Sequence, residues 1–346
     1  MTDAKSLEAI VGAPPAIILM KQVGTLDEGC RSVFRSAPVA GFGFRDRQGI
    51  PHTTVVGGGP GFAHAESPTR FSFEVPADGP GPGEGSGVSF VFLMPGLGET
   101  LRLNGTAVER SGTNVVVEMK EAYVHCAKCI RRSRLWDEVP VDSAPKNLAV
   151  AEFLASSSFV LVSSWDAGGS SDTSPKGDAP GFIRMLDDQT LAIPDRKGNK
   201  RTDTFHNLLT CDEISLAALA PGRDDVLHMG GTAYVTDDPA LLSTMAVKDG
   251  ERLPHAALII RVQRAEILAN EAVRMSRMWD RSAHVDRSQA PDMNRIAAQH
   301  IASSKAPGAK ASMTRVLSKG LAAAPSKLVE RAMDVAYRKD LEDEGY

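Results

Sequence analysis

Short runs of apolar or alternating residues follow one another through most of the chain, which is the pattern of β-strands rather than of long amphipathic helices. Turn-forming clusters such as Asp166–Ser171 and Pro221-Gly222 separate these runs. In the second half of the chain the pattern predicts strands at Phe159–Trp165, Gly181–Leu186, Thr190–Pro194, Ile214–Ala218, Val226–Val235 and His255–Ile267. Strands at this spacing predict a small closed or partly closed barrel.

Helical patterns are confined to short patches and to the two ends of the chain. The patches are Ala127–Leu135, Thr202–Leu209, Pro239–Lys248 and Ala269–Met278, and the tail adds Pro291–Ser304 and Met313–Tyr337. Residues 78–87, rich in Gly and Pro, predict a loop. We expect the tail to be an accessory helical segment that packs on the barrels. The alternative is a partner-binding or membrane-surface role.

The chain repeats itself, and the repeat sets the expected architecture. Pro95–Ala107 aligns with Pro221–Ala233, and Val117–Asp137 aligns with Ile260–Asp280, where both copies end in Ser-Arg-x-Trp-Asp. A weaker pair is Pro60–Phe62 with Pro180–Phe182. Because the pairs keep their order, we predict two copies of one domain. The predicted boundaries are an N-terminal helical extension at 1–32, the two copies at 33–140 and 150–285, and the helical tail at 286–346.

Composition narrows the class of protein without giving its function. The chain has 346 residues, 42% of them hydrophobic, and a net charge of −4. This mix is typical of a soluble globular protein, and no global basic field favours nucleic acid or a membrane as partner. No apolar run approaches the ~18 residues that a membrane span needs. Four cysteines are too few for a disulfide framework, so we expect a cytoplasmic protein.

One segment concentrates charged chemistry. Between Ile193 and Asp203, four cations surround Gly198, namely Arg196, Lys197, Lys200 and Arg201. They lie between a predicted strand end and a predicted helix start, where free backbone N–H groups and cations together suit a phosphate monoester. A solvated basic turn is the alternative interpretation.

The segment Asp172–Gly181 reads Asp-Thr-Ser-Pro-Lys-Gly-Asp-Ala-Pro-Gly, and the basic turn reads Ile-Pro-Asp-Arg-Lys-Gly-Asn-Lys-Arg. Together with Ala122–Trp136 and Pro95–Gly105, these motifs resemble the pyridoxamine 5′-phosphate oxidase-related FMN-binding family, the split β-barrel flavoproteins. The resemblance covers roughly residues 30–282. It implies a β-dominated α+β fold class: two tandem FMN-binding split β-barrels with helical N- and C-terminal extensions, arranged as a pseudo-dimer within one chain. A further homodimer stays open.

The resemblance also implies where FMN would bind, in a groove between the two barrels. The residues that it places there come from both copies. Lys200 and Arg201 would hold the phosphate with Asn199 beside them. The other candidates are Asp172, Ser174, Pro175 and Lys176 along the isoalloxazine edge, Ile193, Pro194 and Asp195 beside the ribityl chain, and His125, Lys128, Arg131 and Trp136 from the first copy.

The two copies differ where a phosphate would bind. The first copy has no cation between Arg70 and Arg102, so we expect its own phosphate site to be lost. The second copy lacks the His-Cys-x-Lys-Cys run that begins at His125 in the first. One half-site from each copy would then form a single composite site, which predicts one FMN per chain.

Other chemistries are less well supported by the sequence. Cys126 and Cys129 have no second pair to complete a four-ligand zinc site, so we expect no metal site. They also lack the parallel βαβ context of a redox pair. Trp136 and Trp279, matched in the repeat, fit core positions better than flavin-stacking ones.

The reaction is less defined than the cofactor. An FMN-dependent oxidoreductase or reductase, with hydride transfer at the flavin and a small-molecule substrate or NAD(P)H as partner, is the favoured function. No Arg-x-His pair follows Ile267, which argues against true pyridoxine phosphate oxidation. His125 is a candidate proton donor or a structural histidine. The rival hypothesis is a non-catalytic protein that binds a flavin, a deazaflavin or haem.

Overall fold

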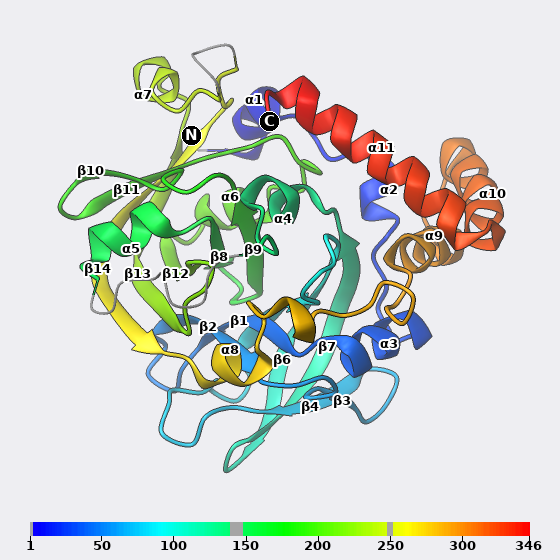
Figure 1. The fold of residues 1–346 in the computed structure, drawn as a ribbon, viewed down its shortest axis with the longest axis horizontal. Coiled ribbons are helices and arrows are strands. Elements are labelled where there is room, and N and C mark those ends of the chain that lie inside the picture. The colour runs from blue at the N-terminus through cyan, green and yellow to red at the C-terminus, as the bar shows by residue number, and fades with distance from the viewer. Residues whose placement is uncertain (1–2, 139–147, 248–251) are drawn as a thin grey trace.

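The computed structural model describes residues 3–138, 148–247 and 252–346, and consists of two seven-stranded antiparallel sheets with helices around them (Figure 1). Sheet one contains β1 (Val39–Arg45), β2 (Pro51–Gly57), β3 (His64–Ala65), β4 (Arg70–Glu74), β5 (Gly87–Leu93), β6 (Thr100–Ser111) and β7 (Asn114–His125). Sheet two contains β8 (Phe159–Trp165), β9 (Ser171–Gly177), β10 (Arg184–Asp187), β11 (Thr190–Pro194), β12 (Glu213–Leu219), β13 (Asp225–Thr236) and β14 (Ala257–Ala269).

The two sheets have the same topology. The first runs β2-β1-β5-β6-β7-β4-β3, and the second, from its far edge, runs β9-β8-β12-β13-β14-β11-β10. Each strand of the second sheet thus corresponds to the strand seven numbers earlier, and the β1–β2 and β8–β9 pairs share one register, with Val39 opposite Gly57 and Phe159 opposite Gly177. The prediction of two copies of one split-barrel domain in tandem is confirmed.

Helices fill the connections and both ends of the chain. The described helices are α1 (Ala4–Val11), α2 (Ala16–Leu19), α3 (Glu28–Ser36), α4 (Lys128–Ser133), α5 (Val150–Ser156), α6 (Asp203–Leu208), α7 (Pro239–Ser243), α8 (Glu271–Ser276), the 3-10 turn η1 (Arg281–Ala283), α9 (Met293–Ser303), α10 (Ala309–Ala323) and α11 (Ser326–Glu344). In Figure 1 the last three lie together on one side, and α11 returns across the molecule to end beside α1. None of the described helices is long and apolar enough to cross a membrane.

Three large apolar clusters form the cores of the two barrels and the contact between them. The core of the first barrel is rich in phenylalanine, with Phe42, Phe73 and Phe90 in mutual ring contact, whereas that of the second is mainly aliphatic. A third cluster lies between the barrels and takes side chains from both, including Val91 and Leu161. Burial of apolar area is the main stabilising term in association, so this shared core makes the two barrels a pseudo-dimer within one chain.

A pair of tryptophans marks the same position in each copy. Trp136 donates its indole N–H to the carbonyl of Leu97 at 2.6 Å, and Trp279 donates to the carbonyl of Arg223, also at 2.6 Å. The two acceptors occupy equivalent places in the repeat, two residues after Pro95 and Pro221. The indole rings lie 6.3 Å apart, so the two copies meet at these side chains.

Three sequence predictions differ from the structure. No strand was predicted around Pro175, but this segment is the edge strand β9; proline is tolerated there because an edge strand leaves one row of N–H groups without ladder partners. The strand expected at 181–186 begins only at Arg184. The helix expected at 313–337 is two helices, because Pro325 cannot continue α10 and instead precedes the first residue of α11.

The predicted domain boundaries remain a working division of the chain. Helix α3 crosses the boundary between residues 32 and 33. The boundary at residue 140 and the end of the helix predicted at 239–248 lie outside the described residues, and α7 ends at Ser243.

The matched indole hydrogen bonds predict matched losses of stability. We expect Trp136→Phe and Trp279→Phe each to lower the free energy of unfolding by about 1–2 kcal/mol more than Trp165→Phe does. The third substitution is the control, because the buried indole N–H of Trp165 has no acceptor among the described residues. Urea denaturation of the three variants gives the comparison, and a loss confined to one of the two matched positions would contradict the equivalence.

Candidate functional site

A cavity of about 450 Å³ lies between the two barrels. The first barrel contributes Arg102 from β6 and residues of the segment from His125 to Arg132, at the end of β7 and in α4. The second contributes Ser174–Gly177 of β9 and the turn from Pro194 to Thr202. The end of α1, residues 9–12, completes the wall. The cavity lies within the ~300–1,000 Å³ range of small-molecule sites and needs both barrels to exist.

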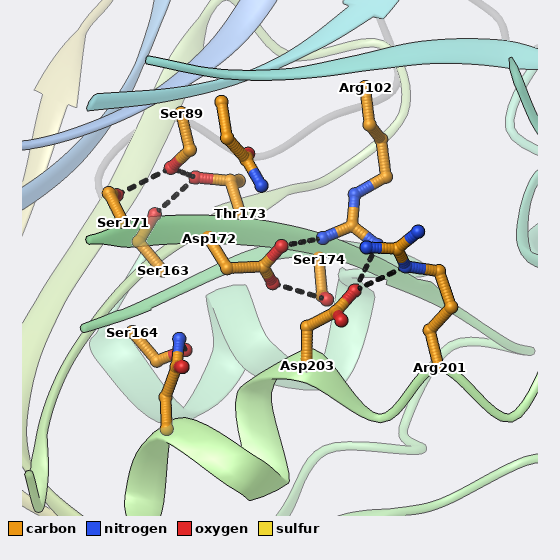
Figure 2. A network of polar contacts seen from close by, with 12 residues as sticks. Ser89, Arg102, Ser163, Ser164, Ser171, Asp172, Thr173, Ser174, Arg201 and Asp203 are labelled. Atoms are coloured by element: carbon orange, nitrogen blue, oxygen red, sulfur yellow. Dashed lines mark hydrogen bonds and ion pairs between the residues drawn. The ribbon is translucent and has the colours of Figure 1, made fainter. Parts of the chain in front are cut away.

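A buried group of ion pairs joins the barrels beside this cavity (Figure 2). Arg102, 2% exposed, donates through Nη2 to Asp172 Oδ1, and its Nη1 lies 3.6 Å from Asp203 Oδ2. Arg201 donates through Nε to that same Asp203 oxygen at 2.9 Å. Burial acts to raise the pKa of Asp203, but the two guanidinium groups outweigh it and hold that pKa below its usual range. One carboxylate therefore fixes both arginines.

Tyr123 lies against the same group. The guanidinium of Arg201 is 3.9 Å from the centre of the Tyr123 ring, and that of Arg102 is 5.2 Å from it. The Tyr123 hydroxyl donates to Asp203 Oδ2 at 3.3 Å. Burial raises the pKa of Tyr123 well above its usual value, so the hydroxyl stays protonated and remains a donor. Stacking against this ring further restricts both arginine side chains.

A chain of hydroxyl groups continues the contact between the sheets. Ser89 Oγ lies 2.6 Å from Ser171 Oγ and 2.7 Å from Thr173 Oγ1, and Thr173 in turn lies 2.8 Å from Ser163 Oγ. Thr53 donates to Ser163 at 2.8 Å. All five side chains are buried, and Figure 2 shows four of them meeting where β9 faces the first sheet. Their hydrogen bonds satisfy polar groups that burial would otherwise destabilise, and they fix β9 beside the cavity.

The basic turn has an unusual backbone. Lys200 and Thr202 have φ angles of 59° and 48°, in the left-handed region that residues other than glycine rarely adopt. Asn199 stabilises the turn by accepting the Arg201 N–H at 3.0 Å, and Arg132 of the first barrel donates to the Lys197 carbonyl at 3.0 Å. Backbone strain of this kind is common at ligand-binding sites.

Several buried polar atoms of the cavity lining have no hydrogen-bond partner in the described part of the chain. They are Arg201 Nη1, His125 Nδ1, Thr204 Oγ1 and Arg102 Nε. A buried polar atom left without a partner costs about 1–3 kcal/mol, so four in one cavity favour a polar ligand that satisfies them. This residue set therefore fits an anionic, hydrogen-bonding ligand.

The structure brings most of the predicted site residues together. Those that line the cavity are His125, Lys128, Ser174, Pro175, Lys176, Pro194, Asp195, Asn199, Lys200 and Arg201. Asp172 is buried behind the lining on Arg102, and also accepts from Ser174 Oγ at 3.0 Å.

Three predicted site residues lie elsewhere. Ile193 is in the core of the second barrel, because its side chain alternates with Pro194 along β11 and faces away. Arg131 points toward α11, where it pairs with Asp334 and lies 5.0 Å from the Tyr337 ring. Trp136 packs on Trp279. Their positions suit structural roles, and none of the three lines the cavity.

The chain ends contribute groups that the sequence analysis missed. Glu344, near the end of α11, lies 2.9 Å from Lys128 Nζ and 3.1 Å from Arg132 Nη1. Tyr346 donates its hydroxyl to Asp178 at 2.9 Å. The only available signal was the acidic sequence from Asp340 to Glu344, opposite in charge to the lysine and arginines of α4. The tail thus neutralises two cations of the cavity wall.

A second cavity, of about 710 Å³, lies in the corresponding position of the pseudo-dimer. Its lining includes His52 and His228, which take the places of Asp172 and Arg102 in the repeat, and Glu271, which takes that of Lys128. Where the first cavity has the basic turn, this one has uncharged residues after Glu74. The second cavity is thus present, but it lacks the basic turn that would suit a phosphate in the first cavity.

The four cysteines form no disulfide in the described part of the chain. All four are free thiols, and burial raises the pKa of Cys129 to about 12. Cys30 lies with Asp27 and His300 in the one group of possible metal ligands found among the described residues. Asp27 already accepts the Cys30 N–H at 2.9 Å and pairs with His300 at 3.0 Å. We interpret this group as the contact that anchors α9 to α3.

One known protein family matches the second barrel. Residues 148–275 match the family model described as pyridoxamine 5′-phosphate oxidase. No curated protein is significantly similar to the chain.

Solved structures similar to this chain each cover about a third of it. HupZ of Group A Streptococcus is 23% identical over 36% of this chain and 98% of its own, with a TM-score of 0.30. A pyridoxamine 5′-phosphate oxidase-related, FMN-binding protein of Nostoc punctiforme is 11% identical over 38% and 86%, with a TM-score of 0.27. An F420 reductase is 11% identical over 36% and 98%, with a TM-score of 0.26.

The environment of His125 predicts a pH effect on stability. Burial, with the nearby charges of Arg102 and Lys21, lowers the pKa of His125 to about 3, whereas an unfolded histidine titrates near ~6.5. Between these values the unfolded chain binds a proton that the folded chain does not, so stability falls as the pH falls. We expect the unfolding free energy of His125→Asn to fall by about 2 kcal/mol less than that of the wild type between about pH 7 and about pH 5.

Urea denaturation at the two pH values measures this difference. The control is His64→Asn, which changes an exposed histidine on β3 and should follow the wild type. If His125→Asn lost as much stability as the wild type on acidification, its imidazole would not be held neutral in the folded protein.

Proposed function

Because the second barrel, residues 148–275, matches the pyridoxamine 5′-phosphate oxidase family and the first barrel repeats its topology, we propose that this chain is a flavoprotein that binds one FMN between its barrels. The observation that carries the proposal is the first cavity, which draws its lining from both barrels and contains the Lys200-Arg201 turn. The four unpartnered polar atoms in its wall support a ligand rich in hydrogen-bonding groups.

Lys200 and Arg201 bind the FMN phosphate in this proposal, with Asn199 holding the turn in shape. An arginine whose Nη1 has no partner among the described residues, next to a lysine that lines the same cavity, gives the phosphate a directional donor and a point charge. Arg102 and Asp203 act indirectly, by fixing the Arg201 side chain.

The remaining lining residues would hold the rest of the cofactor. Ser174, Pro175 and Lys176 of β9 lie along the flavin ring system, and Pro194 and Asp195 lie beside the ribityl chain. His125 and Lys128 approach from the first barrel. FMN would supply the hydride or electron chemistry, while the protein orients it and excludes water. His125, whose Nδ1 has no partner in the described chain, would offer the cofactor a neutral hydrogen-bonding group, because burial keeps its pKa low.

We propose an FMN-dependent oxidoreductase acting on a small-molecule substrate, with NAD(P)H as a possible electron donor. The alternative is a protein that binds a flavin, a deazaflavin or haem without turnover. One observation favours the deazaflavin: Lys128 and Arg132 are a second group of cations in the same cavity, which would suit an acidic extension of the cofactor. Asp340 and Glu344 of the tail now pair with them.

The absorption spectrum of the purified protein, with identification of the released chromophore, separates these possibilities. We expect a flavin spectrum and one FMN per chain, because the second cavity lacks the basic turn. Addition of NAD(P)H under anaerobic conditions should bleach the bound flavin. A Soret band or a released deazaflavin would contradict FMN as the cofactor. Two FMN per chain would contradict the single site. A bound flavin that no reductant bleaches would favour the protein that binds its cofactor without turnover.

The phosphate assignment predicts a selective loss of affinity. Lys200→Ala/Arg201→Ala removes two charge-assisted contacts worth about 1.5–3 kcal/mol each, so FMN should bind about 100-fold to 10,000-fold more weakly. Riboflavin lacks the phosphate, and its affinity should be nearly the same for the variant and the wild type. Equilibrium titration, monitored by flavin fluorescence, measures both ligands.

The matched control is Lys5→Ala/Lys120→Ala, which removes two exposed lysines that do not line the cavity. It should bind FMN like the wild type. If the turn variant lost riboflavin and FMN affinity equally, the turn would hold the cavity's shape rather than the phosphate.

A further inference from the structure

Helix α10 presents its large apolar side chains to solvent. Met313, Val316, Leu317 and Leu321 are 67%, 68%, 66% and 46% exposed. Their spacing of three and four residues places them on one side of the helix. We refer to these four residues as the α10 stripe.

The opposite side of α10 packs on the protein with small and polar residues. Ala311 and Ser318 are buried, and α10 lies against α9. Arg315 donates through Nη1 to the carbonyls of Ala306 and Ser304, at 2.6 and 3.3 Å. A surface helix normally buries its apolar side and exposes its polar one. Since α10 does the reverse and is nonetheless anchored, its stripe is free to contact something outside the described chain.

The sequence through α9 and α10 carries charges of a single sign. From Met293 to Val329 the sequence contains no Asp or Glu and six cations: Arg295, Lys305, Lys310, Arg315, Lys319 and Lys327. At 100° per residue, Lys310 falls within the stripe, between Leu317 and Leu321, whereas Lys319 falls about 60° beyond Val316; both lysines are exposed. The whole chain has a net charge of −4, so this concentration of positive charge is local.

We propose that α10 docks this protein on an anionic lipid bilayer. The stripe enters the interfacial layer, and Lys310 and Lys319 extend to the lipid headgroups, as in basic amphipathic helices that lie on a membrane. The absence of a membrane-spanning helix among those described accords with a helix that lies on the surface. The proposal takes up the membrane-surface role that the sequence analysis left as an alternative for the tail, and it does not depend on FMN.

A bilayer accounts for the charges better than a second copy of the chain does. Two α10 helices packed stripe to stripe would bury Lys310, which lies within the stripe, and α10 contains no Asp or Glu that could pair with it. An anionic surface attracts Lys310 and Lys319 and also buries the apolar side chains.

Vesicle co-sedimentation of the full chain tests the proposal. We expect binding to phosphatidylcholine vesicles that contain about 30% phosphatidylglycerol, weaker binding to phosphatidylcholine alone, and a decrease as salt is raised. Met313→Ser/Val316→Ser/Leu317→Ser should weaken binding at least about tenfold, and so should Lys310→Glu/Lys319→Glu.

Matched controls change similar side chains elsewhere. Met185→Ser/Leu186→Ser removes an exposed apolar pair of β10, and Lys5→Glu/Lys120→Glu reverses two exposed lysines remote in sequence from α10. Both should bind like the wild type, and circular dichroism should show that every variant is folded.

Three results would overturn the assignment. The first is a wild-type chain that does not bind anionic vesicles. The second is a serine variant that binds them with the same affinity as the wild type. The third is a concentration-dependent dimer in light scattering that disappears in the serine variant, which would assign the stripe to a second copy.

Discussion

The buried ion pair between Arg102 and Asp172 links the two barrels at the position on which the site depends. It joins β6 of the first copy to β9 of the second, and through Asp203 it fixes Arg201 at the start of α6. Buried charges of this kind are tolerable only when each has a partner. The barrels therefore cannot shift relative to each other without leaving a charge unpaired, and the cavity keeps its shape.

This constraint explains why the site is composite. The inter-barrel apolar cluster supplies most of the attraction but little direction, since hydrophobic contact is not directional. The ion pairs, the hydroxyl groups around Thr173 and the matched tryptophans specify how the barrels align. A cation from one barrel and a strained turn from the other then meet across one cavity.

The sequence predicted what depends on local pattern and on the internal repeat. Alternating apolar residues located β11 and β12 closely, and the repeated Ser-Arg-x-Trp-Asp ending placed Trp136 and Trp279 in matched positions. The basic turn was recognisable because its cations are adjacent in sequence.

What the sequence could not predict depends on contacts between distant segments. No strand was predicted at β9, because Pro175 argues against a central strand and nothing local reveals that β9 is an edge strand. The pairing of Arg102 with Asp172 joins residues 70 positions apart, and that of Glu344 with Lys128 joins residues 216 positions apart. The family resemblance placed Arg131 and Trp136 at the cavity together with His125, but successive residues of α4 and the turn after it face different neighbours.

The tandem arrangement has an evolutionary consequence. In a homodimer every substitution occurs twice, so two symmetric cavities must change together. Here the corresponding positions are separate codons: Arg102 and His228, or Lys128 and Glu271, can be selected independently. In a tandem chain one cavity can therefore keep its cations while the other carries His52, His228 and Glu271 at the corresponding positions.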